Sequence, residues 1–140
     1  MQESSELKDL IRGWYESVAK GDITFTERVT SRQPEVLVIG TDPREWWVGY
    51  DKIVEVYRAQ FEEMGAGSGL QFLPGDTKAY SEGDVGWVAD QPTVRLPDGH
   101  EVPMRVTAVF RREDGEWKVV QLHGSVGVAN EEAVGSELTV

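Results

Sequence analysis

The chain has 140 residues, of which 39% are apolar and 28% are charged, a composition typical of one ordinary globular domain. Its formal net charge of −11 argues against nucleic acid and anionic membranes as partners, because both require a basic protein surface. Cysteine is absent, which excludes disulfides, thiolate metal ligands and a cysteine nucleophile. The sequence shows neither a membrane-spanning apolar run nor the pattern of a signal peptide, so we expect a cytoplasmic location.

Three helices are predicted in the first half of the chain. The first is capped by Ser4 or Ser5 and ends at Lys20-Gly21-Asp22, and a short second helix covers residues 23–29. Helical spacing places one continuous apolar face on the first helix, made of Leu7, Leu10, Ile11, Trp14, Tyr15 and Val18. The third helix covers residues 51–64, with an apolar face made of Ile53, Val54, Tyr57, Phe61 and Met64.

Between the second and third helices, the β-branched run at residues 35–40 predicts a buried strand. Asp42-Pro43 then favours a turn, which places Trp46 and Trp47 in or beside a loop. The two tryptophans either pack under that loop or take part in function, and one of the two adjacent side chains has to face outward. After the third helix, the glycine-rich residues 65–69 are predicted to link the helical half to a half made of strands.

The second half contains the clearest hairpin, two valine-rich runs around a turn at residues 113–116. Strands are also predicted over residues 77–81 and 85–94, the second with a bulge or edge at Pro92, before a loose tail from residue 130. Strict alternation along the last strand separates two sets of side chains. One set is Trp117, Val119, Gln121, His123 and Ser125, and the other is Val120, Leu122 and Val126. We therefore expect His123 and Ser125 on the face that lines a pocket.

Helices followed by an antiparallel meander indicate an α+β fold. This order resembles the SnoaL-like branch of the nuclear-transport-factor-2-like superfamily, the cystatin-like α+β cone. The resemblance covers nearly the whole chain and rests on residues 21–22, 40–51, 83–88 and 117–125. It implies one domain over residues 1–130 with a tail at 131–140, three helices on a curved antiparallel sheet, and a homodimer formed through the outer sheet face. The aliphatic set on the last strand is expected to contribute to that dimer.

His123 is the first candidate for chemistry, because its ordinary pKa lies near neutrality and lets it carry a proton. Asp90 is the best carboxylate in a predicted strand to fix its tautomer, although a surface ion pair between Asp90 and Arg105 is the favoured explanation of these two residues. The second histidine, His100, sits in a turn, and the two histidines do not have the spacing of metal ligands. We therefore expect no metal and no cofactor.

Three functions remain open from the sequence, and it does not decide whether the protein is an enzyme. The first is binding of a small apolar molecule in a cone-shaped cavity. The second is acid–base catalysis of the isomerase, cyclase or dehydratase type by His123 with Asp90 or Tyr57. The third is a non-catalytic homodimerisation module. The expected cavity residues are Trp14, Tyr15, Tyr57, Phe61, Trp87, Arg105, Gln121 and Ser125.

Overall fold

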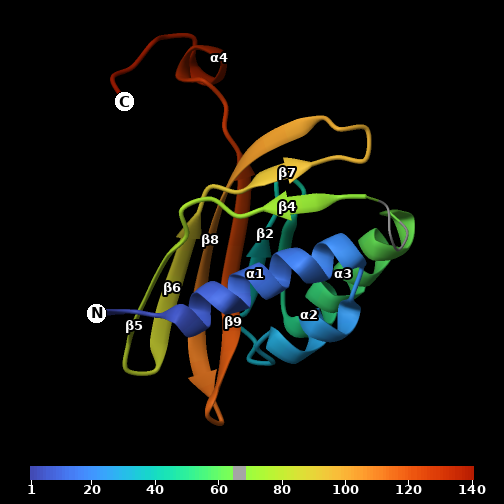
Figure 1. The fold of residues 1–140 in the computed structure, drawn as a ribbon, viewed down its shortest axis with the longest axis vertical. Coiled ribbons are helices and arrows are strands. Elements are labelled where there is room, and N and C mark those ends of the chain that lie inside the picture. The colour runs from blue at the N-terminus through green and yellow to red at the C-terminus, as the bar shows by residue number, and fades with distance from the viewer. Residues whose placement is uncertain (65–68) are drawn as a thin grey trace.

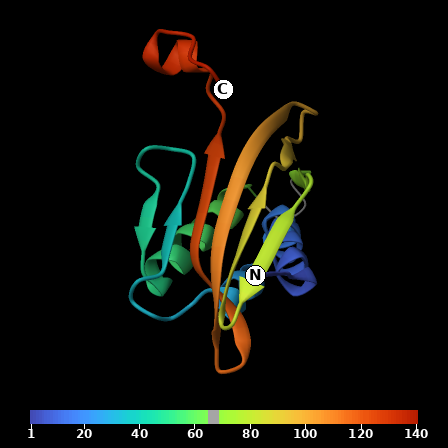
Figure 2. The same ribbon diagram turned by 90° about the vertical axis from the view of Figure 1, so that its left-hand side faces the viewer.

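The computed structural model describes residues 1–64 and 69–140, and it shows helices packed against a strongly curved sheet (Figures 1 and 2). The helices in this described part of the chain are α1 (Ser5–Lys20), α2 (Ile23–Val29), α3 (Tyr50–Met64) and α4 (Asn130–Val134). The strands are β1 (Gln2–Glu3), β2 (Leu37–Ile39), β3 (Trp46–Val48), β4 (Gln71–Leu73), β5 (Lys78–Glu82), β6 (Val85–Asp90), β7 (Thr93–Arg95), β8 (Glu101–Glu113) and β9 (Glu116–Val126).

The sheet is mixed rather than purely antiparallel, which corrects the prediction. Its order is β1-β5-β6-β8-β9-β2-β3, with β4 and β7 continuing from β8. Most neighbours are antiparallel, but β2 runs parallel to β9, with Leu37 opposite Gln121 and Ile39 opposite His123. Parallel strands require a crossover connection, and β2 is separated from β9 by most of the chain, with no hairpin joining them. The α+β class is confirmed.

The helix predictions are accurate because local chemistry fixes the ends of α1 and α2. The Ser4 hydroxyl accepts a hydrogen bond from the Leu7 amide at 3.2 Å, which caps α1. Gly21 ends α1 in the left-handed conformation at φ 69°, which glycine adopts without steric cost. Helix α2 has the predicted bounds, and α3 begins one residue earlier than predicted.

The strand predictions are less accurate. The expected strand at 35–40 shortens to β2, and the expected strand at 85–94 breaks between Asp90 and Thr93 into β6 and β7. Trp46 and Trp47, expected in or beside a loop, lie beside it, in β3, which pairs with β2 directly after the turn. The tail contains the short helix α4, and residues 131–140 are all exposed. Of the predicted glycine-rich link, residues 65–68 lie outside the described part of the chain.

A β-bulge in the β8–β9 hairpin reverses the side-chain alternation along β9. Val109 lies opposite Gln121, whereas the next residue, Phe110, lies opposite Val119, so Val120 is an extra residue in the ladder. One extra residue exchanges the two faces of a strand beyond that point. Trp117 and Val119 therefore point to the inner face before the bulge, and Leu122 and Gly124 point to it afterwards.

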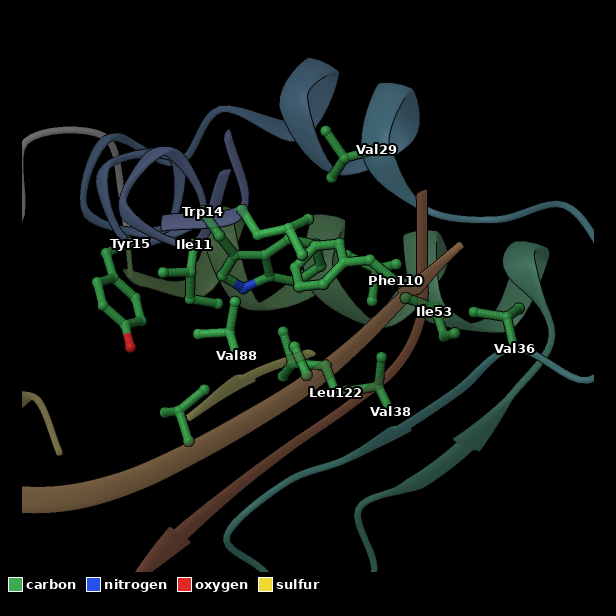
Figure 3. Packing of buried hydrophobic residues seen from close by; sticks show 14 of the residues in the cluster. Ile11, Trp14, Tyr15, Val29, Val36, Val38, Ile53, Val88, Phe110 and Leu122 are labelled. Carbon is green, nitrogen blue, oxygen red and sulfur yellow. The ribbon is translucent and has the colours of Figure 1, made fainter. Parts of the chain in front are cut away.

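The main core lies between the sheet and α1 to α3. Figure 3 shows Ile11 and Trp14 projecting from α1 toward the sheet, from which Val88 and Leu122 point back. Phe110 and Ile53 fill the adjacent space and are almost completely buried. The opposite face of the long β6-β8-β9 sheet carries mixed side chains, among them the exposed Arg105, Thr107 and His123.

Candidate functional site

A cavity of about 170 Å³ opens between α1, α3 and the inner face of the sheet. Aromatic and aliphatic side chains make most of its wall, with few polar groups, which is the composition of a typical small-molecule site. The described lining residues are Trp14, Tyr15, Val18, Ile39, Gly40, Thr41, Glu45, Trp47, Tyr57, Gln60, Phe72, Met104, Val106, Leu122 and Gly124.

One polar group of the wall is a tyrosine bound to a buried carboxylate. The Tyr15 hydroxyl donates a hydrogen bond to Oδ2 of Asp90 at 2.9 Å, and Asp90 is only 4% exposed. Oδ1 of Asp90 accepts hydrogen bonds from the backbone amides of Gly75 at 3.1 Å and Gln91 at 2.9 Å. Burial, together with the Asp90 carboxylate, raises the pKa of Tyr15 well above its ordinary value. Tyr15 is therefore neutral, and its hydroxyl proton is held in the hydrogen bond to Asp90.

A second carboxylate, that of Glu45, lies on the cavity wall itself. Its Oε1 accepts a hydrogen bond from the Asp42 amide at 2.8 Å, and its Oε2 accepts one from Nε2 of Gln60 at 3.3 Å. Gly40 makes room for it, because a Cβ at Gly40 would lie 2.8 Å from Cβ of Glu45 and 3.0 Å from its Oε1. The turn after β2 and helix α3 thus fix this carboxylate in place.

Tyr57 joins these polar groups to the aromatic wall. Its ring contacts those of Trp14 and Trp47 edge-to-face, with centroid distances of 5.4 and 5.8 Å. Burial and the Glu45 carboxylate raise the pKa of Tyr57 well above its ordinary value, and a hydrogen bond with Trp14 opposes part of that rise. Tyr57 is neutral at physiological pH for the same reason as Tyr15.

The structure brings only some of the predicted site residues to this cavity. Trp14, Tyr15 and Tyr57 line it. Asp90 lies directly behind Tyr15 and is not in a surface ion pair with Arg105. Phe61 is buried in the core, where its ring lies 5.8 Å from that of Tyr57, and it does not appear in the described lining.

The other predicted residues lie outside the cavity, and His123 is the most important of them. Because of the bulge at Val120, His123, Gln121 and Ser125 fall on the outer sheet face, where His123 is exposed. Arg105 is exposed on the same face, and Trp87 packs there against Tyr80 with a centroid distance of 5.2 Å. The expected pairing of His123 with Asp90 is therefore wrong, because the two side chains lie on opposite faces of the sheet.

Sequence reasoning missed several residues of the wall. Glu45 and Gln60 are among its polar groups, and Phe72 and Met104 are among its apolar ones. Gln60 carries a detectable signal, since it follows Tyr57 at helical spacing on the inner side of α3. Glu45 carries no such signal, because the turn predicted at Asp42-Pro43 does not by itself indicate that the Glu45 side chain lies beside Gly40.

No metal site is visible in the described part of the chain, where no three His, Asp or Glu side chains are grouped to hold an ion. Within residues 1–64 and 69–140, no helix is long and apolar enough to cross a membrane.

The sequence profile of the SnoaL-like domain matches residues 7–129 of this chain. The chain belongs to the SnoaL-like domain family. The match includes every described residue that lines the cavity. No curated protein matches the chain.

Solved structures similar to this SnoaL-like domain agree on the fold. A nuclear transport factor 2-like protein of unknown function from Pseudomonas putida has a TM-score of 0.79 at 20% identity, over 94% of both chains. A candidate dehydratase of the same superfamily from Streptomyces avermitilis has a TM-score of 0.76 at 18% identity, over 89% of this chain and 95% of its own. A candidate calcium/calmodulin-dependent protein kinase II association domain from Xanthomonas campestris has a TM-score of 0.70 at 17% identity, over 91% of this chain and 89% of its own. Such identities establish the fold and leave the function of this SnoaL-like domain open.

Proposed function

We propose that this SnoaL-like domain binds a small, largely apolar molecule in the cavity between α1, α3 and the sheet. The observation that carries the proposal is the wall itself, which combines five aromatic rings with a few fixed polar groups. The volume limits the ligand. A cavity of about 150 Å³ holds a molecule of the size of benzene, so the cavity of about 170 Å³ suits a compact ligand and not a steroid.

Proton transfer by His123 is not part of this proposal, because its ring lies on the outer face of the sheet. The polar groups available to a ligand are Glu45, Gln60, Thr41 and the hydroxyls of Tyr15 and Tyr57. They are sufficient to orient a bound molecule through one or two hydrogen bonds.

Filling the cavity tests the proposal. Val106 lines the cavity and its neighbour Thr107 is exposed on the other face of β8, so Val106→Trp and Thr107→Trp form a matched pair. In an NMR titration with phenol as the probe, we expect the amides of Gly40 and Gly124 to shift in the wild type and in Thr107→Trp. The same shifts should be lost in Val106→Trp. Phenol that shifts no cavity amide in the wild type, or equally many in Val106→Trp, contradicts the proposal.

We also propose that two copies associate through the outer face of β6, β8 and β9. The face carries the half-buried apolar side chains of Trp87, Val109 and Val120, and one similar structure is that of a kinase association domain. Leu122, which the sequence assigned to this face, instead lines the cavity. Val126 shares the inner side with Leu122 beyond the bulge, so the predicted contribution of the aliphatic row is reduced to Val120.

Light scattering of the purified protein measures whether it is a dimer in solution. We expect a mass of twice the 15.6 kDa of the chain for the wild type. Thr107→Glu places a charge at the centre of the face, opposite His123 in the β8–β9 ladder, and should shift the mass to that of one chain. Ala59→Glu, an exposed position on α3, makes the same change in charge and should leave the dimer intact. A wild-type protein that elutes as a single chain rules out this interface.

A further inference from the structure

Five aromatic side chains belong to the described cavity wall, and their rings contact one another at different angles. Trp14 and Trp47 both meet Tyr57 nearly edge-on, with interplanar angles of 86° and 75°. Tyr15 and Phe72 form a stacked pair, with centroids 5.3 Å apart. Because the face of each ring carries partial negative charge, a cage of rings in different orientations attracts a cation more strongly than a neutral molecule.

The formal charge on the wall has the matching sign. Among the described residues that line the cavity, Glu45 alone is charged, and none of them is Lys, Arg or His. The neighbouring cation, Arg44, is turned to Asp42, with Nε–Oδ1 and Nη2–Oδ2 distances of 3.0 and 3.2 Å. The described ion pairs do not include Glu45. A half-buried carboxylate next to an apolar wall is costly unless a positive group compensates it, and a ligand can supply that group.

The hydrogen bond between Tyr15 and Asp90 also favours a positively charged ligand. Since Tyr15 donates its proton to Asp90, its oxygen can act toward a ligand only as an acceptor. The Asp90 carboxylate, 2.9 Å behind that oxygen, adds a second negative charge close to the wall. Both carboxylates therefore favour a positive ligand and disfavour an anion.

We infer that the ligand is a small organic ammonium cation, held by the aromatic cage and by Glu45. The inference rests on the proposed function, because it specifies the chemistry of the molecule that the cavity binds. A cavity of about 170 Å³ is large enough for a trimethylammonium group with a short substituent. Recognition of such groups by aromatic cages is a known use of the interaction between cations and rings.

Choline and 3,3-dimethylbutan-1-ol provide a direct test, because they have the same shape and differ in the central atom, nitrogen with a positive charge or neutral carbon. Titration calorimetry of the full chain should show choline binding about tenfold more tightly than the alcohol. Glu45→Gln should lower the affinity for choline about tenfold and leave that for the alcohol unchanged. Glu55→Gln, an exposed position on α3 with the same loss of net charge, should change neither affinity.

The possible results distinguish a failure of the preference for a cation from a failure of small-molecule binding in the cavity. Equal affinities for choline and the alcohol, both lost in Val106→Trp, overturn the preference for a cation and leave the small-molecule cavity supported. Choline binding that persists in Val106→Trp places the cation on the acidic surface and overturns the inference. Failure of both compounds to bind, together with failure of phenol, overturns both proposals.

Discussion

Asp90→Ala is expected to lower the free energy of unfolding by about 3–5 kcal/mol, because it removes the charged acceptor of one buried hydroxyl and of two backbone amides in part-buried hydrogen bonds. The Tyr15 hydroxyl and the amides of Gly75 and Gln91 all donate to this carboxylate. Gly75 must approach closely to do so, since a Cβ there would lie 2.5 Å from the carbonyl oxygen of Gln91. Urea unfolding followed by tryptophan fluorescence measures the loss.

Asp90→Asn is the informative companion variant. Its Oδ1 can still accept from both backbone amides and its Nδ2 can donate to the Tyr15 oxygen, so only the Tyr15 proton has to find another acceptor. We expect a cost of about 1 kcal/mol or less, since the substitution also removes a buried charge. Asp9→Ala, an exposed position on α1, should change stability by less than about 0.5 kcal/mol. An Asp90→Asn protein as unstable as Asp90→Ala would show that the charge, not the hydrogen bonding, is what the fold requires.

Stability is expected to fall steeply above pH 10, because the folded protein keeps Tyr15 and Tyr57 protonated. The folded pKa of each tyrosine is raised above its ordinary value, so the unfolded chain loses these protons first. The stabilisation is fully present below the unfolded pKa of about 10 and is lost as the pH rises beyond it. The slope is about 1.4 kcal/mol per pH unit for each tyrosine, or about 3 kcal/mol for both by pH 11.

Urea midpoints between pH 8 and pH 11 measure this slope. Tyr15→Phe and Tyr57→Phe should each remove about half of it, and the double variant should remove nearly all of it. Phe72→Leu, which contacts Tyr15 but has no titratable group, should lower stability by a similar amount at every pH. If the stability of the double variant fell with pH as steeply as that of the wild type, other groups would be responsible for the loss of stability at alkaline pH.

The sequence predicts this fold well where the signal is local. Ser4 and Gly21 determine the ends of α1 through their own chemistry, and the apolar faces of α1 and α3 follow from helical spacing. The hairpin of β8 and β9 is equally clear from its turn. The parallel pairing of β2 with β9 is not local, since it joins residues more than 80 positions apart, and no residue pattern near Leu37 or Ile39 specifies it.

The candidate site was predicted only in part for the same reason. Trp14, Tyr15 and Tyr57 lie on helices, where spacing alone determines which side faces inward. His123, Gln121 and Ser125 lie on a strand beyond an irregularity, and one unpaired residue was enough to place them on the wrong face. Glu45 reaches the cavity through a turn whose geometry depends on contact with Gly40, which becomes visible only in three dimensions.

The extra residue Val120 also bears on how a cavity of this kind changes its chemistry during evolution. A regular ladder that paired Val120 with Val109 would exchange the two rows of side chains along the rest of β9, bringing His123 inward and sending Leu122 outward. The backbone ladder with β8 could re-form with little change. A titratable wall and an aliphatic wall are therefore separated by one step in the register of β9, whereas substitution at each lining position would need several independent events. Substitutions that create or remove a bulge in the last strand thus offer a short route between chemically different pockets on one scaffold.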